Sequence, residues 1–144
     1  VAQVVGARPA PIYALLAAGL VPVIAPLALD EQGVICNVNA DEAAAGLAGA
    51  MGARLVLLTD TDGVLDARGR RLATLDELTA EQLMTERVIR DGMLPKVRGA
   101  LAALRSGAPE AVIADGRAAD ALSRALDDAG FGTRLRHSPG EAEA

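Results

Sequence analysis

Residues 55–63 read Leu-Val-Leu-Leu-Thr-Asp-Thr-Asp-Gly, an apolar run that ends in a short polar turn. A strand covered on both faces shows such a continuous run, whereas a half-exposed strand alternates apolar with polar residues. We therefore expect a strand over residues 54–59 in the middle of a sheet. Just before it, alanine and leucine residues recur at helical spacing over positions 40–51, and Gly52 is a typical helix end.

The alternation of helix and strand continues on both sides of this unit. Upstream we expect a helix from Pro11 to Gly19, a strand over residues 20–25 and a hairpin over residues 27–36. Downstream we expect a hairpin turn at 66–69, a helix opened by a capping box at 79–82, a helix after Gly92, a strand at 111–114, a helix over 118–126 and a strand at 133–135. Because such alternation implies crossover connections, the sequence predicts an α/β fold, a three-layer α/β/α sandwich with a mostly parallel central sheet.

The composition favours one compact domain that binds small molecules. The 144 residues match the length of one typical domain, and 51% of them are hydrophobic. The net charge of −5 weighs against a nucleic-acid partner, because such proteins need a basic surface to neutralise phosphates. The single cysteine, Cys36, allows neither an internal disulfide nor a cysteine-based zinc cluster, and we expect a cytoplasmic protein.

An uncharged segment over residues 9–29 has the length of a membrane-spanning helix. Pro22 and Pro26 contradict that interpretation, because prolines break the interior of a helix. The segment also lacks the basic start and small-residue cleavage site of a signal peptide. We therefore expect no membrane partner.

The first candidate site is Asn37-Val38-Asn39-Ala40-Asp41, at the start of the helix over residues 40–51. The N–H groups and dipole of a helix N-terminus attract anions, and asparagine side chains both donate and accept hydrogen bonds. Asp41 could orient a lysine that contacts a phosphate. The alternative is structural: Asn39 caps the helix and Asp41 interacts favourably with its dipole.

The second candidate site is the loop Asp60–Val64, since ligands of open α/β sheets bind beyond the carboxyl ends of strands. Gly63 could let a nucleotide approach the backbone, although an ordinary polar turn has the same composition. The Asp-x-Asp-Gly start is similar to a calcium loop, but Gly63 comes too early for an EF-hand and Arg71 occupies the position of the terminal glutamate. We reject calcium, and the sequence identifies no metal ligand.

The third candidate is Lys96, within Asp91-Gly92-Met93-Leu94-Pro95-Lys96-Val97. Pro95 suits the first turn of a helix, so Lys96 would lie near the positive end of that helix. Phosphoryl transfer depends on positive charge fixed beside the moving oxygens, which Lys96 could supply; a plain surface lysine is the alternative. Neither a P-loop motif nor a G-x-G-x-x-G motif occurs.

Together these segments resemble the N-acetyl-L-glutamate kinases of the amino acid kinase family. The resemblance rests on Asn37–Asp41, Leu57–Leu65 and Asp91–Val97 in this order and spacing, and extends to residues 21–26 and 132–134. It implies that residues 1–135 form the C-terminal, nucleotide-binding part of an amino acid kinase domain, followed by a polar tail over residues 136–144. It also implies ATP-dependent phosphorylation of the γ-carboxylate of N-acetyl-L-glutamate, in arginine biosynthesis.

The resemblance also implies a role for each candidate residue. Asn37 and Asn39 would bind acetylglutamate, Asp41 would hold the catalytic lysines in place, and Lys96 would stabilise the phosphoryl group as it leaves ATP. The residues that would line the nucleotide site are Asp60, Thr61, Asp62, Gly63, Val64, Leu65, Ile89, Arg90 and Asp91. Mg²⁺ would accompany ATP, and we expect a homodimer or a higher homo-oligomer.

Members of this family begin with a strand and a glycine-rich loop that contains a second catalytic lysine, followed by a glycine pair and a substrate-binding arginine. Lys96 is the only lysine of these 144 residues, and none of those elements occurs among them. The resemblance therefore implies that this sequence corresponds to the second half of such an enzyme. Two alternatives remain open: a kinase of carrier-bound aminoadipate in lysine biosynthesis, and a non-catalytic module for nucleotide binding or assembly.

Overall fold

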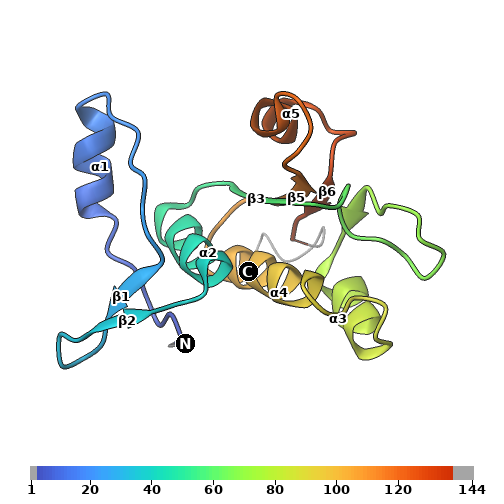
Figure 1. The fold of residues 1–144 in the computed structure, drawn as a ribbon, viewed down its shortest axis with the longest axis horizontal. Helices are drawn as coiled ribbons and strands as arrows, with labels where there is room; N and C mark the ends of the chain where they lie inside the picture. Colours follow the sequence, from blue (N-terminus) through green and yellow to red (C-terminus); the bar gives the residue numbers. More distant parts are fainter. Residues whose placement is uncertain (1–2, 138–144) are drawn as a thin grey trace.

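The computed structural model describes residues 3–137 of the chain (Figure 1). Its helices are α1 (Ala10–Ala17), α2 (Ala40–Met51), α3 (Glu77–Thr85), α4 (Met93–Arg105) and α5 (Ala121–Asp127). Its strands are β1 (Leu27–Leu29), β2 (Ile35–Asn37), β3 (Leu55–Thr59), β4 (Thr74–Leu75), β5 (Ala111–Asp115) and β6 (Thr133–Leu135). The expected hairpin is present, because β1 and β2 pair antiparallel around a turn with Gly33 at φ 80°.

The central sheet has the strand order β3-β5-β6-β4. β3 pairs with β5 in parallel and β4 pairs with β6 in parallel, whereas β5 and β6 are antiparallel. The predicted mostly parallel sheet is thus confirmed. The expectation that β3 lies mid-sheet is wrong within the described residues, where β3 is an end strand. Helices lie on both faces of β3 and bury Leu55 and Leu57, although Leu58 is 43% exposed; such cover does not require a strand on each side.

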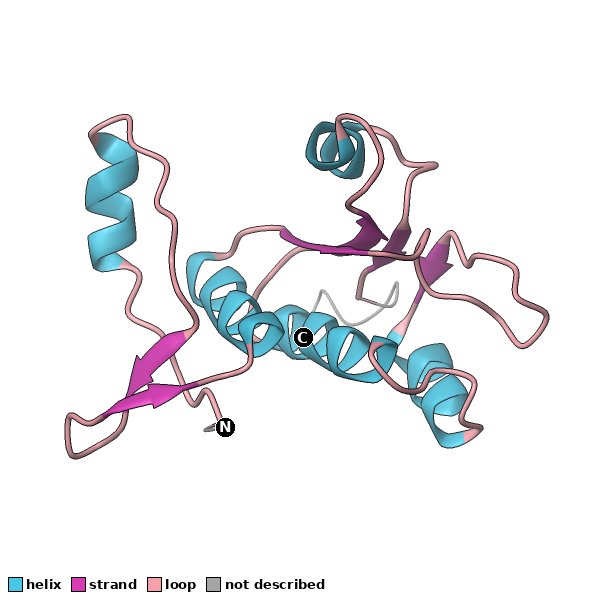
Figure 2. Ribbon diagram, viewed as in Figure 1, coloured by secondary structure: helices cyan, strands magenta, loops and turns pink. Residues whose placement is uncertain are grey.

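Helices cover both faces of this sheet (Figure 2). α2 and α4 pack together on one face, and α5 lies against β3 and β5 on the other, which confirms the α/β/α layers. A larger apolar core lies on the α2–α4 side and a smaller one on the α5 side. The two long helices approach closely at Gly49, where an added Cβ would lie 2.4 Å from the Cβ of Ser106.

Residues 3–37 contribute little to this core. None of the residues of α1 is buried, and α1 and the β1–β2 hairpin project from the body of the molecule (Figure 2). The strand expected over residues 20–25 is wrong, because this segment pairs with no strand in the described part of the chain. The side chains of Val21 and Val23 are 87% and 97% exposed.

Local signals predicted both ends of α2 and the start of α4, whereas the expected bounds of α1 and α5 are wrong: α1 ends at Ala17 and not near Gly19, and α5 begins at Ala121 and not at 118. α2 spans the predicted residues 40–51, and Gly52 ends it in a left-handed conformation. α3 begins before the expected capping box, since Asp76 and not Thr79 is its N-cap. No helix between residues 3 and 137 combines the length and apolar character needed to cross a bilayer. Of the expected polar tail, residues 136 and 137 are exposed, and residues 138–144 lie outside the described residues.

Candidate active site

Asp41, Lys96 and the loop at 60–65 lie toward the carboxyl edge of β3 and β5, whereas Asn37 ends a strand of the projecting hairpin (Figure 1). α2 and α4 each run opposite to the strand that follows them, so both helices begin near that edge (Figure 1). Asp41 lies in the first turn of α2 and Lys96 in the first turn of α4. The loop over residues 60–65 leaves the same edge directly after β3.

Lys96 and Asp41 form a two-pronged ion pair. The Nζ atom of Lys96 lies 3.2 Å from Oδ1 and 3.1 Å from Oδ2 of Asp41. The two side chains are 21% and 20% exposed. The pair therefore joins α2 to α4 and leaves the ammonium partly accessible, as contact with a phosphate requires.

The two asparagines differ in their surroundings. Asn39 is the N-cap of α2: its Oδ1 accepts hydrogen bonds from the N–H groups of Asp41 (2.8 Å) and Glu42 (3.3 Å). The structure confirms that Asn39 caps α2, and its Nδ2 group remains free of this cap and able to donate to a ligand. Asn37 is the last residue of β2 and is exposed.

The loop Asp60–Leu65 combines exposed polar side chains with an anchored backbone. Asp60 and Asp62 are exposed, whereas Gly63 and Val64 are buried. Gly63 has a φ of 141°, a backbone conformation that residues with a Cβ rarely adopt. The polar half of the loop can therefore contact a ligand, while the apolar half fixes it to the sheet.

A second loop at this edge was missed by the sequence reasoning and follows β5. The Arg117 guanidinium pairs with Asp115 through Nε (2.9 Å) and Nη2 (3.0 Å), which lowers the pKa of the Asp115 carboxyl. The pKa of Arg117 is raised by Asp115 first, and also by Asp60 and Asp62 of the neighbouring loop. The Asp115-Gly116 pair at the end of a buried strand, which is similar to Asp62-Gly63 shortly after β3, is the signal that could have identified it.

Residues 89–91 lie in the connection between α3 and α4. Ile89 is buried in the core, so only its main chain can face a nucleotide, whereas Arg90 and Asp91 are exposed. Asp91 has a φ of 50°, a left-handed conformation that is uncommon outside glycine. The chain therefore turns sharply just before the helix that contains Lys96.

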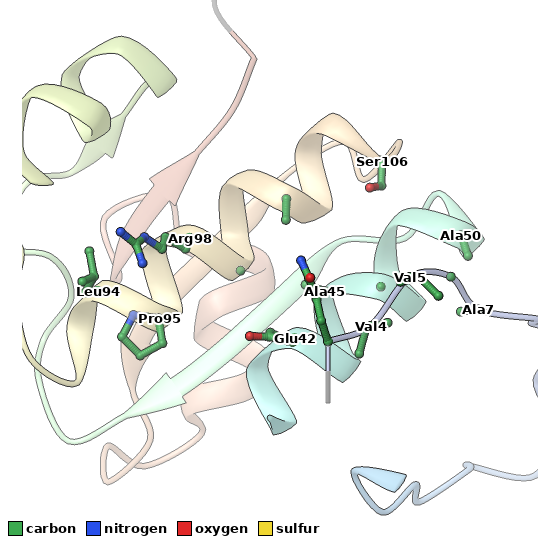
Figure 3. Close-up of a pocket in the computed structure, with 15 residues that line it drawn as sticks. Val4, Val5, Ala7, Glu42, Ala45, Ala50, Leu94, Pro95, Arg98 and Ser106 are labelled. Carbon is green, nitrogen blue, oxygen red and sulfur yellow. The ribbon is translucent and has the colours of Figure 1, made fainter. Parts of the chain in front are cut away.

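A cavity of about 650 Å³ lies beside this site, between residues 3–7 and the helices α2 and α4 (Figure 3). Glu42, Pro95 and Arg98 line it together with small residues of both helices. Neither Lys96 nor Asp41 lines it, although Pro95 and Glu42 are their neighbours in the chain. The cavity is therefore adjacent to the polar site and separate from it.

The described residues form two polar groups at one edge of the sheet. No hydrogen bond or ion pair within residues 3–137 links the Lys96–Asp41 pair to the loops at 60–65 and 115–117. These residues also bring no three His, Cys, Asp or Glu side chains together as a metal site. An oriented amine beside two polar loops suits the binding and transfer of an anionic group.

The sequence profile of the amino acid kinase family matches residues 1–115. An acetylglutamate kinase of Oleidesulfovibrio alaskensis is 42% identical over 137 residues, which cover 94% of this chain and 46% of that protein. The chain thus spans about half the length of the curated relatives it matches.

Solved structures give the same fold. N-acetylglutamate synthase from Neisseria gonorrhoeae, complexed with coenzyme A and L-arginine, matches with a TM-score of 0.79 at 27% identity, over 88% of this chain and 30% of that one. Carbamate kinase from Giardia lamblia bound to AMP-PNP matches with a TM-score of 0.59 at 25% identity, over 76% and 36% of the two chains.

Proposed function

Because the chain belongs to the amino acid kinase family, we propose that it forms the nucleotide-binding part of an acetylglutamate kinase. The 42% identity to a kinase of that name supports this choice within the family. The observation with most weight is the Lys96–Asp41 ion pair at the start of two helices. Phosphoryl transfer needs positive charge fixed where the phosphoryl group moves, and this pair fixes an ammonium.

In the proposed reaction, a γ-carboxylate oxygen of N-acetyl-L-glutamate attacks the γ-phosphorus of ATP. The new O–P bond forms as the bond from that phosphorus to the bridging oxygen breaks, and ADP leaves. Lys96 balances the charge of the moving phosphoryl group, while Asp41 orients its ammonium. Asn37 and Asn39 bind acetylglutamate, the latter through Nδ2 because its Oδ1 caps α2.

The nucleotide lies along the carboxyl edge of the sheet, over the loop at 60–65 and the main chain of residues 89–91. Asp60 and Asp62 offer exposed carboxylate oxygens that can accept hydrogen bonds from ribose hydroxyl groups. Arg117 offers a guanidinium that interacts electrostatically with Asp60 and Asp62 of the same loop. The AMP-PNP complex of the carbamate kinase match supports a nucleotide as ligand.

Mg²⁺ fits this site only as an ion bound to the nucleotide. The described residues offer no cluster of carboxylates for it, and Mg²⁺ commonly binds through phosphates with one or two carboxylates. When bound, it neutralises phosphate charge during transfer. We assign it no ligand from this chain.

The activity is proposed for a whole enzyme of which this chain spans about half the length of its relatives. As an acetylglutamate kinase, the enzyme would act in arginine biosynthesis, in the cytoplasm. We further propose a homodimer or higher homo-oligomer, which light scattering of the purified protein tests directly.

The proposal is tested by calorimetric titration of this chain with Mg-ATP and with N-acetyl-L-glutamate, followed by a hydroxylamine assay for acyl phosphate. We expect Mg-ATP to bind, and we expect Lys96→Met to abolish any acyl phosphate formed while nucleotide still binds. Absence of Mg-ATP binding to the folded wild-type chain would contradict the assignment of the nucleotide site.

One observation favours a second candidate function. The synthase match has this fold although it is not named a kinase, so the fold alone does not imply phosphoryl transfer, and a module that binds a ligand or mediates assembly is the second candidate. Under that alternative a ligand binds without phosphoryl transfer, even in the whole protein. The carrier-bound aminoadipate kinase is distinguished by comparing turnover of carrier-bound aminoadipate with turnover of free acetylglutamate.

A further inference from the structure

Thr133, the first residue of β6, makes two hydrogen bonds to a distant part of the chain. Its hydroxyl accepts a hydrogen bond from the N–H of Val64 at 2.8 Å and donates one to the carbonyl of Leu72 at 2.6 Å. Thr133 and Val64 are both fully buried, and 69 residues separate them. One hydroxyl therefore ties both ends of the segment 64–72 to the sheet.

Gly63 fits against the same hydroxyl. A Cβ on Gly63 would lie 2.5 Å from Oγ1 of Thr133, a distance that Cβ atoms do not tolerate. The segment is also held by Arg71, whose guanidinium donates to the carbonyl groups of Gly130 (2.8 Å) and Gly132. Thr133 and the two glycines before it therefore hold both ends of the segment 64–72, which follows the polar loop.

We propose that Thr133 is a positioning residue for the nucleotide, acting through the main chain of Gly63 and Val64. This inference rests on the proposed function, since it assigns a role within the proposed nucleotide site. Thr133 itself is fully buried, so its side chain is not accessible to a ligand. Its hydroxyl fixes the far end of the loop at Val64, while β3 fixes the near end at Thr59, and so limits where Asp60 and Asp62 present their carboxylates.

The side chain of threonine allows a test that keeps its shape. Thr133→Val replaces the hydroxyl with a methyl group and leaves the Val64 N–H and the Leu72 carbonyl without that partner, whereas Thr133→Ser retains the hydroxyl. Since an unsatisfied buried N–H is costly, the loop should move to find another partner. We expect Thr133→Val to weaken Mg-ATP binding on the order of tenfold and Thr133→Ser to restore most of it.

A matched control separates this role from general loss of stability. Val112→Ala removes apolar volume from β5 on the α5 side, in the smaller core and away from the loop. All four proteins are studied well below their unfolding midpoints. Amide hydrogen exchange of residues 60–65 reports the loop, and calorimetry with Mg-ATP reports the site.

The expected result is faster exchange at residues 60–65 and weaker Mg-ATP binding in Thr133→Val alone. The inference is wrong if the valine variant binds Mg-ATP as tightly as the wild type, or if Val112→Ala weakens binding equally. If the wild-type chain binds no Mg-ATP, the proposed function fails and this inference with it. If the wild-type chain binds Mg-ATP but Thr133→Val does not weaken that binding, this inference is wrong and the proposed function stands.

Discussion

The Nζ atom of Lys96 lies 3.1 Å from Oδ2 of Asp41, although 55 residues separate them in the chain. The two helices that contain them begin at the same edge of the sheet, which places each side chain in a first helical turn. The ammonium is thus held by a carboxylate and by the geometry of two packed helices. A lysine held in this way loses little freedom when it meets a phosphate.

Lys96→Met should remove the charge and keep most of the apolar stem. If Lys96 acts on the moving phosphoryl group, kcat of the active enzyme should fall about 100-fold to 1,000-fold, since one such donor typically contributes that much. KM for ATP should change far less, because the interaction strengthens in the transition state. Steady-state kinetics in both substrates measure the two effects.

Arg98→Met is a matched control for Lys96→Met. Arg98 is a second cation of α4, but it is exposed and lines the adjacent cavity. Its replacement should leave kcat close to the wild-type value. Equal losses in the two variants, or a loss confined to KM, would contradict the role of Lys96.

Asp41→Asn should also lower kcat, because the amide no longer orients the ammonium by charge. Its effect should not add to that of Lys96→Met, since residues that act as one unit are strongly coupled. A double-mutant cycle on kcat/KM measures the coupling. Simple additivity of the two losses would show that Asp41 acts independently of Lys96.

Local patterns predicted much of the fold. The bounds of α2 and its glycine end were confirmed to the residue. Both depend on neighbouring residues alone: apolar residues at helical spacing, and a glycine that can adopt the left-handed conformation. The strand over residues 20–25 was wrong, because an extended apolar segment becomes a strand only when a partner strand lies beside it. The place of β3 in the sheet likewise depends on pairing order, which its own residues do not encode.

In the candidate site, too, some contacts could be predicted from the sequence and others depend on residues far apart in the chain. The resemblance implied that Asp41 would hold the catalytic lysines in place; its carboxylate pairs with Lys96 in the structure, and its catalytic role stays a prediction. No local pattern could place Thr133 against Val64, since the contact joins residues far apart in the sequence. The pairing of Arg117 with Asp115 is local, but its relation to Asp60 and Asp62 depends on the parallel pairing of β3 and β5.

Asp76 should make the stability of the protein depend on pH. Its Oδ1 accepts a hydrogen bond from the N–H of Thr79 at 2.7 Å, and this bond is the main cause that lowers the pKa of Asp76 below 3.8. A carboxyl whose pKa is lowered on folding stabilises the fold above its unfolded pKa. That contribution should therefore be lost as the pH falls below 3.8 and through the lower folded pKa.

Two variants test this cap by urea unfolding at pH 7 and pH 3. Asp76→Ala should lower the free energy of unfolding by about 1 kcal/mol at pH 7 and by less at pH 3. Asp76→Asn should stay near the wild-type value at pH 7, because asparagine is also a good N-cap, and should lose less on acidification. An alanine effect that is equal at both pH values would show that the charge of Asp76 contributes nothing.

Glu110 should be the most costly charged residue to remove. Its carboxylate pairs with Arg134 at 2.9 Å, and both residues are almost fully buried, at 6% and 5% exposure. Arg134 also donates to the carbonyl groups of Ala125 and Asp128, so the pair links the start of β5 to the end of α5. Glu110→Ala leaves a buried guanidinium without its counter-charge, and should lower the free energy of unfolding by about 3–5 kcal/mol.

The cost should come from the orphaned charge and not from a strong attraction. Replacing both partners, as in Glu110→Leu with Arg134→Met, should therefore recover much of the stability lost in Glu110→Ala, because a buried ion pair gains little over apolar packing. Glu86→Ala, at an exposed position after α3, is the control and should have little effect. Urea unfolding of the three variants and the wild type measures these differences. A loss below about 1 kcal/mol in Glu110→Ala would mean that water reaches Arg134 and solvates it, as for an exposed pair.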